Sequence, residues 1–183
     1  MSRVKSIEPA TASGRAKELL DSVQKSFGMT PNLMRIMANQ PAVLDAYLKF
    51  SNALEQGSLD AKTREGIALT SAGANACGYC ASAHTAISKM LNVEPVEIEA
   101  QLAGRSSDKK LAAALAFTRT LIAKRGDVSN ADITALRAAG HDDGAIIEIV
   151  ANVVANILTN YLSHVSQTEI DFPVVDPTPH RIV

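Results

Sequence analysis

Apolar residues recur three and four positions apart along most of the chain, which is the spacing of one face of an α-helix. Leu19, Leu20, Val23 and Phe27 show this spacing in the first helical segment. No segment alternates apolar and polar residues in the way that a half-buried β-strand does. The pattern therefore predicts an all-α fold.

Glycine, proline and capping residues divide this pattern into separate helices. The predicted helices cover residues 12–27, 32–39, 41–56, 61–74, 77–91, 95–103, 108–124, 130–139 and 142–166. Thr11 or Ser13 is expected to cap the first helix. We predict a single domain with an extended N-terminus (1–10), a helical core (11–166) and an irregular, proline-containing tail (167–183).

Composition argues against several classes of function. The chain has 183 residues, 46% apolar and 4% aromatic, with a net charge of −1, so it carries no basic field for nucleic acid or an anionic membrane. The first twenty residues lack the apolar core of a secretory signal. The most apolar segment, 145–162, contains Glu148 and three asparagines and is a poor membrane span. We expect a cytoplasmic protein.

Residues 65–84 contain the candidate chemistry. Both cysteines of the chain, Cys77 and Cys80, form a C-x-x-C, with His84 four residues further on and Glu65 twelve residues before Cys77. On a helix, positions three and four apart share a face, so the cysteines and His84 are expected to lie on one stripe. A thiol pair, an imidazole and a carboxylate are the groups needed for thiol redox chemistry.

The cysteine pair has three interpretations. It is a redox pair, or half of a zinc site completed by His84 and Glu65, or two inert core residues, since free cysteine is often buried. A structural zinc site uses four protein ligands, and no second C-x-x-C is present. Two cysteines are also too few for a disulfide scaffold, so we favour the redox interpretation.

Two local effects point to different cysteines as the thiolate. A helix N-terminus near Cys77 favours Cys77, whereas the imidazole of His84 one turn on favours Cys80. We favour attack by Cys80, because His84 can accept its proton and return one to a leaving oxygen. Cys77 would then resolve the sulfenic acid. Glu65 either stabilises a helix N-terminus or tunes the proton affinity of His84.

The last predicted helix carries a polar stripe with a four-residue spacing. Its members are Glu148, Asn152, Asn156, Asn160 and His164. Because most of these are neutral amides rather than charges, we predict hydrogen bonding in a partly buried groove or subunit contact. The stripe drifts around the helix axis, so not all five can reach one site. His164 is a possible accessory residue of the cysteine site, whereas His141 and His180 are expected at the surface.

The motif Glu65-x11-Cys77-x2-Cys80-x3-His84 lies between two further characteristic segments, TPNLMRIMANQPAVLDAYLKFSNAL and EIVANVVANILTNYLSHVSQTEIDFP. Together they resemble the alkylhydroperoxidase D-like core of the carboxymuconolactone decarboxylase superfamily, in its uncharacterised peroxidase-related branch. The resemblance covers nearly the whole chain. It implies an all-helical homo-oligomer, often a hexamer built from dimers or trimers, that reduces small hydroperoxides. It also implies a proton relay of Glu65, His84 and Cys80.

One position departs from this family. The best-characterised member has a second histidine directly before its second cysteine, where this chain has Tyr79. Tyr79 could donate a hydrogen bond there, but its ordinary pKa of about 10 makes it a poor proton shuttle at neutral pH. The decarboxylase branch lacks the C-x-x-C, so lactone decarboxylation is a poor match.

The main hypothesis is thus a thiol peroxidase-like oxidoreductase. We expect no bound cofactor or metal, and a separate dithiol reductant, because no glycine-rich dinucleotide motif is present. One alternative is a dithiol sensor or oxidoreductase without peroxide turnover, whose disulfide state changes the oligomer. Another is a metal-binding helical assembly module that uses Cys77, Cys80, His84 and Glu65.

Overall fold

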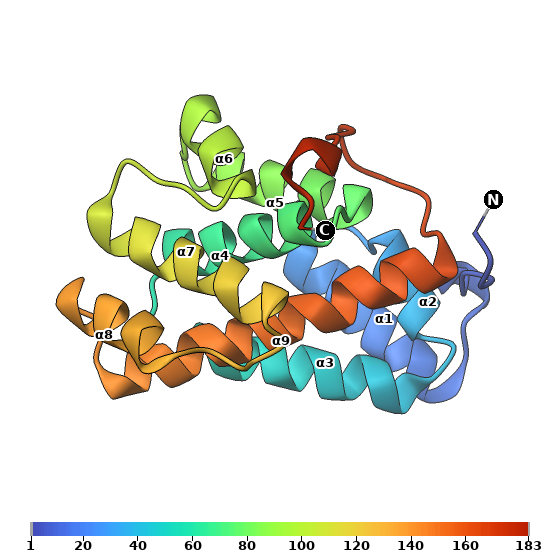
Figure 1. Cartoon of the computed structure of the whole chain (residues 1–183). Helices are drawn as coiled ribbons and strands as arrows, with labels where there is room; N and C mark the ends of the chain where they lie inside the picture. Colours follow the sequence, from blue (N-terminus) through green and yellow to red (C-terminus); the bar gives the residue numbers. More distant parts are fainter. Residues whose placement is uncertain (1, 183) are drawn as a thin grey trace.

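The computed structural model describes residues 2–182 as a bundle of α-helices (Figure 1). The helices are α1 (Gly14–Phe27), α2 (Asn32–Met37), α3 (Pro41–Glu55), α4 (Ala61–Ala74), α5 (Gly78–Met90), α6 (Pro95–Leu102), α7 (Lys109–Ala123), α8 (Asn130–Ala138) and α9 (Asp143–Ser166). No strand occurs in these residues. The all-α prediction is confirmed, and each predicted helix end lies within two residues of the observed one.

Local capping signals explain most of these boundaries. Asp60, Asp108 and Asp142 each accept a hydrogen bond from the backbone N–H three residues on, which satisfies a donor that the helix leaves free. The expected cap of α1 was wrong. Ser13 has the extended backbone of a capping residue but makes no side-chain cap, and the Thr11 hydroxyl bonds backward within a short 3₁₀ turn.

Helix α4 is the centre of the bundle and packs against α5, α6, α7 and α9. Every residue from 66 to 74 is buried, as expected for a helix without a polar face. Small residues let neighbours approach closely: a Cβ added at Gly73 would lie 2.1 Å from the backbone oxygen of Leu102, at the end of α6. The motif helix is therefore held from several sides.

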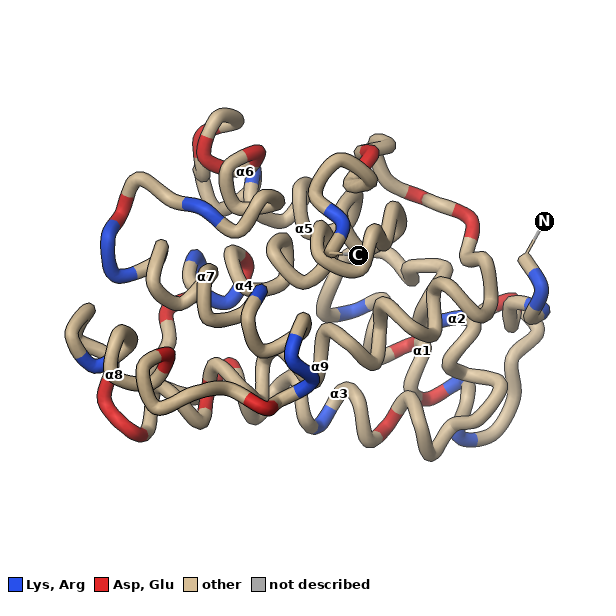
Figure 2. The backbone as a smooth tube through the Cα atoms, viewed as in Figure 1, with Lys and Arg blue, Asp and Glu red and all other residues tan. Residues whose placement is uncertain are grey.

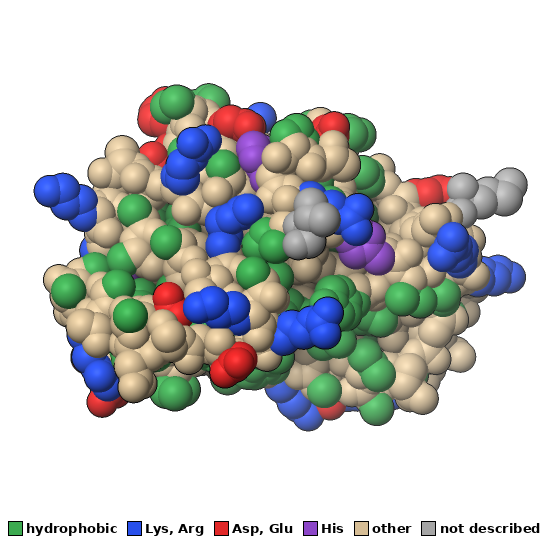
Figure 3. Space-filling model, in the orientation of Figure 1, with side chains coloured by type: hydrophobic (Ala, Val, Ile, Leu, Met, Phe, Trp, Pro, Cys, Tyr) green, Lys and Arg blue, Asp and Glu red, His purple; other side chains and the backbone are tan. Residues whose placement is uncertain are grey.

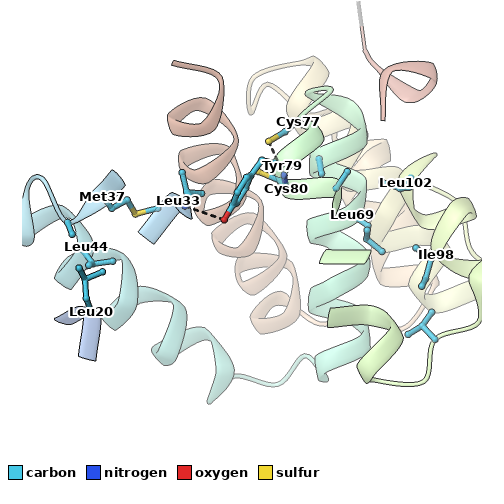
Figure 4. Packing of buried hydrophobic residues seen from close by; sticks show 14 of the residues in the cluster. Leu20, Leu33, Met37, Leu44, Leu69, Cys77, Tyr79, Cys80, Ile98 and Leu102 are labelled. Atoms are coloured by element: carbon cyan, nitrogen blue, oxygen red, sulfur yellow. Dashed lines mark hydrogen bonds between the residues drawn. The ribbon is translucent and has the colours of Figure 1, made fainter. Parts of the chain in front are cut away.

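The apolar core divides into two clusters that share α4. One joins α1, α2 and α3 to α4, α5 and α6, and it includes Cys77, Tyr79 and Cys80 (Figure 4). The other joins α4 to α7, α8 and the first part of α9. Cys77 and Cys80 are only 1% and 2% exposed. The two thiols thus belong to the packed interior rather than to an open surface.

Helix α9 is 24 residues long and crosses the face of the bundle (Figure 1). In the described part of the chain it alone is long and apolar enough to span a membrane, but half of its most apolar window is buried inside the protein. It behaves as a core helix. Lysine, arginine, aspartate and glutamate are scattered over the rest of the molecule without a single-signed region (Figure 2).

Residues 168–182, called here the C-terminal strap, run from the end of α9 across the start of α5. The backbone N–H of Val175 donates to the Ser82 hydroxyl at 3.0 Å, and that of Ile182 donates to the Ala74 carbonyl at 2.9 Å. The strap is irregular apart from the 3₁₀ turn Thr178–His180. It is nevertheless tied to both helices that carry the motif.

Candidate functional site

The cysteines sit at a sharp turn between α4 and α5. The N–H of Cys77 donates to the Ala72 carbonyl, and that of Ala76 donates to Gly73, which is the Schellman pattern of helix termination. Ala76 occupies the left-handed position, with φ of 52°. Glycine is usual there, and an L-residue costs roughly 1–2 kcal/mol. The turn is therefore imposed by its surroundings, and it fixes where Cys77 points.

Cys77 ends one helix and caps the next. Its Sγ accepts the N–H of Cys80 at 3.3 Å (Figure 4), so it faces the positive end of α5. The thiol of Cys80 also donates to Cys77. Together with a hydrogen bond from Ser163 and the charge of His164, these donors outweigh burial and lower the pKa of Cys77 to about 6.

Cys80 shows the opposite behaviour. Burial, and then the neighbouring Cys77, raise the pKa of Cys80 well above its ordinary value. The hydrogen bond from the Cys80 thiol is the largest of these effects on the pKa of Cys77, so the resting negative charge lies on Cys77, with a proton on Cys80. This differs from the expectation that His84 would make Cys80 the resting thiolate. Within residues 2–182, no hydrogen bond joins the His84 ring to Cys80; His84 bonds to Glu65 instead.

Glu65 and His84 form a hydrogen-bonded pair between α4 and α5. His84 Nδ1 lies 2.8 Å from Glu65 Oε2, and the two side chains are 21% and 16% exposed. Burial favours the neutral imidazole, but the charges of Glu65 and Cys77 outweigh it and raise the pKa of His84 above 6.5. Protonation of the imidazole is thereby favoured near the sulfur of Cys77.

Polar side chains of helix α9 cover the turn that carries the cysteines. Asn75 Nδ2, at the turn, donates to Asn160 Oδ1 at 2.9 Å, and the Asn75 carbonyl lies 2.9 Å from His164 Nε2. Ser163 bonds to Cys77, and the side chain of Asn160 faces Cys80. The predicted hydrogen-bonding role of the α9 stripe is confirmed for Asn160 and His164. Glu148 lies apart and caps the backbone of residues 58–59.

The side chain of Tyr79 points toward α2 rather than toward α9. Its hydroxyl accepts the N–H of Leu33 at 3.2 Å (Figure 4). Its ring makes an edge contact with Phe172 of the strap, with 5.8 Å between the two ring centroids. Burial raises the pKa of Tyr79 further above its ordinary value of 10.0. Tyr79 stays neutral and anchors α2 and the strap beside the cysteines.

A cavity of about 230 Å³ adjoins the Glu65–His84 pair. Its polar lining includes Tyr47 of α3, together with Asn152 and Asn156 of α9. The sequence analysis did not single out Tyr47, which lies three residues after the buried Leu44. Burial, followed by the charges of Cys80 and Glu65, raises the pKa of Tyr47 to about 12, so it presents a neutral hydroxyl.

The four residues considered as a zinc set do not assemble into one. Among residues 2–182 no group of three or more His, Cys, Asp or Glu side chains is arranged to hold a metal ion. The histidines expected at the surface are also more enclosed than predicted. His141 is 3% exposed and bonds to the Lys110 carbonyl, and His180 is half-buried and pairs with Glu99.

Residues 41–123, which span α3 to α7, match the sequence pattern of the carboxymuconolactone decarboxylase family. This segment is similar to that family, and it contains all four residues of the Glu/Cys/Cys/His motif. The donors contributed by α9 lie outside the matched segment. No curated protein matches the chain in sequence.

Solved structures extend the likeness to almost the whole chain. A peroxidase-related protein from Ralstonia eutropha JMP134, with an alkylhydroperoxidase AhpD core, is 25% identical, with a TM-score of 0.83 over 93% of this chain and 92% of that chain. A peroxidase-related protein from Silicibacter sp. TM1040 is 23% identical, with a TM-score of 0.78 over 92% and 94%. Both are uncharacterised. The fold is therefore that of the AhpD core.

The same fold also carries a different activity. The debrominase Bmp8, in a cysteine-to-alanine variant in complex with 2,3,4-tribromopyrrole, is 19% identical, with a TM-score of 0.78 over 93% of this chain and 92% of Bmp8. At that identity the likeness concerns the fold alone. The activity of this protein must be argued from its own side chains.

Proposed function

We propose that the protein is a thiol-dependent oxidoreductase that reduces small alkyl hydroperoxides with Cys77 and Cys80. One observation carries the proposal: the Cys77 sulfur accepts the N–H of Cys80 at the start of α5, on the same helix as His84 of the hydrogen-bonded Glu65–His84 pair. A thiolate, a second thiol and a protonated imidazole are the reactants that peroxide reduction consumes. The adjoining cavity of about 230 Å³ suits a small substrate.

The resting protonation state supplies every proton of the reaction. In our proposal Cys80 passes its proton to the Cys77 thiolate, and the Cys80 sulfur attacks the terminal oxygen of the hydroperoxide. The O–O bond breaks, and the leaving alkoxide takes a proton from His84. The proton on Cys77 then passes to His84. The Cys77 sulfur attacks the Cys80 sulfur, and the hydroxide that leaves takes this proton from His84 as water, which closes the disulfide and leaves His84 neutral. One alcohol and one water form for each disulfide.

The direct test mixes reduced protein with tert-butyl hydroperoxide in a stopped-flow instrument and counts free thiols before and after. Two thiols per chain should disappear at a rate proportional to peroxide. Cys80→Ser should abolish the reaction, and Cys77→Ser should stop at a sulfenic acid that a cyclic dione traps on Cys80. A sulfenic acid trapped on Cys77 in Cys80→Ser would reverse the order of attack. Thiols that survive peroxide would rule out the peroxidase proposal.

Turnover requires a reductant, which we propose is a separate dithiol in the cytoplasm. Adding dithiothreitol or a thioredoxin-type dithiol to the peroxide assay should convert one oxidation per chain into continuous consumption. A protein that oxidises once, changes its oligomeric size and does not turn over with any dithiol would instead fit the alternative of a redox sensor.

We further propose a homo-oligomer that uses the outer face of α9. Large apolar side chains are exposed there with a heptad-like spacing, and hydrophobic atoms gather over this helix in Figure 3. They are Ile147, Val154, Leu158, Tyr161 and Val165. Sedimentation of wild-type protein and of Val154→Lys would test this proposal, because a single buried lysine should dissociate the subunits. A wild-type monomer would refute it.

A further inference from the structure

Asn160 holds a buried hydrogen-bond donor without an acceptor. The residue is fully buried, and its Oδ1 is fixed by the amide of Asn75 at 2.9 Å. Its Nδ2 has no hydrogen-bond partner that meets normal geometry within residues 2–182. A buried donor left unmet costs about 1–3 kcal/mol, and such groups are rare in native proteins. An acceptor that appears during the reaction would account for this one.

The side chain of Asn160 faces the sulfur of Cys80. Burial, and then Cys77, raise the pKa of Cys80, and the nearby side chains of Asn160 and Thr159 oppose this rise. A neutral thiol sulfur is a weak acceptor, whereas a thiolate or a sulfenate oxygen is a strong one. The amide is thus matched to the charged form of Cys80 and not to its resting form.

We propose that Asn160 is a catalytic hydrogen-bond donor that stabilises negative charge on Cys80, as the attacking thiolate and as the sulfenate that follows. The identity of the oxidant rests on the proposed function, but the Asn160–Cys80 link does not. Asn75 acts as a positioning residue, because its contact with Oδ1 turns the Nδ2 group toward the sulfur. Because this donor is already in place in a water-poor site, it stabilises the negative charge on Cys80 without any rearrangement of the protein.

Few other groups can set the charge on Cys80. Cys77 faces it from the start of α5, Tyr47 from α3 and Tyr79 from the same turn. Both tyrosines are neutral near pH 7 because their pKa values are raised. His164 of α9 acts on Cys77. Burial has the largest effect on the pKa of Cys80, and once Cys77 is replaced the side chains of α9 are the groups that oppose it.

The test isolates Cys80 in the full-length Cys77→Ser protein and follows its alkylation by iodoacetamide from pH 6 to 11. Asn160→Leu removes the donor without adding charge and should raise the midpoint by at least about one unit, a tenfold slower reaction at a fixed pH below it. Asn160→Asp keeps the shape and the acceptor for Asn75, and it should raise the midpoint further. It also serves if the leucine variant fails to fold.

The matched control is Cys77 in the Cys80→Ser background, where Asn160→Leu should move the midpoint by less than half as much. A Cys80 midpoint that Asn160→Leu leaves unchanged would overturn the proposal, as would equal shifts for both cysteines, which indicate a general loss of packing. Alkylation needs no peroxide. A wild-type protein inert to hydroperoxides would therefore refute the proposed function while this result still decides the role of Asn160.

Discussion

Replacing Glu65 by glutamine should reverse the sign of the pKa shift of His84. In the native protein Glu65 and Cys77 raise that pKa above 6.5 against the effect of burial. An ionised carboxylate about 4 Å from an imidazolium attracts it by about 4 kcal/mol at an effective dielectric constant near 20. That energy equals roughly three pKa units, part of which solvent screens. Without it burial dominates, and the pKa of His84 should fall below 6.5.

The shift is measured directly by following the His84 ring signals in NMR between pH 4.5 and 9. The peroxide rate should follow it: at pH 7.5 the Glu65→Gln protein should react about tenfold more slowly, because its imidazole is mostly neutral and cannot protonate the leaving oxygen. Glu99→Gln is the matched control. It removes a second carboxylate–histidine pair, formed with His180 at 3.0 Å, and should leave the rate unchanged.

Stability supplies an independent check. Because the folded-state pKa of His84 is raised, its protonation stabilises the protein fully below pH 6.5, and this contribution is lost as the pH rises through the folded-state pKa. The difference in free energy of unfolding between wild type and Glu65→Gln, followed by melting temperature, should therefore widen from pH 8 to pH 5.5. It should widen by about 1.4 kcal/mol for each unit by which the pKa of His84 differs between the two proteins. A His84 pKa that stays above 6.5 in the variant would refute the reasoning.

Three other perturbations test the packing and charge of the site. Gly73→Ala places a Cβ 2.1 Å from the carbonyl at the end of α6 and should lower the free energy of unfolding by about 2–3 kcal/mol in a thermal melt; an unchanged melt would mean that α6 shifts freely. Phe172→Ala removes the edge contact with Tyr79 and should lower the free energy of unfolding by about 2 kcal/mol. It should also speed proteolysis of the strap, and an unchanged rate of proteolysis would contradict the anchoring role of Tyr79. Alkylation of wild-type protein should show one thiol with a midpoint near pH 6, which Cys80→Ala raises by removing the hydrogen bond from the Cys80 thiol; an unmoved midpoint would contradict the assignment to Cys77.

The helices could be predicted from the sequence because their ends are set by nearby residues. Asp60 and Asp108 bond to N–H groups three residues away, and Gly28 ends α1 in the left-handed conformation. The motif spacing likewise brought attention to Glu65 and His84, which the structure joins. These are interactions within a turn or between two consecutive helices.

The charge on the cysteines could not be predicted in this way. It depends in part on Ser163, His164 and Asn160, which reach the turn from α9. These residues are distant in sequence: Asn160 is 85 residues from its partner Asn75. Spacing alone weighed the helix end against His84 without these donors. Tyr47 was missed for a related reason, since only the tertiary structure places it in the lining of the cavity, together with residues of α4, α5 and α9.

The dependence of the thiols on α9 has a consequence for the newly made chain. Before the chain folds, Cys77 lacks the hydrogen bonds from Cys80 and Ser163 and the charge of His164, and a thiol in an unfolded chain has the ordinary pKa of about 8.5. At neutral pH such an immature chain is mostly protonated and slow to oxidise or to form mixed disulfides, although its sulfurs are open to solvent. Reactivity arrives with the final tertiary contacts. The fold thereby delays its own redox chemistry until maturation is complete.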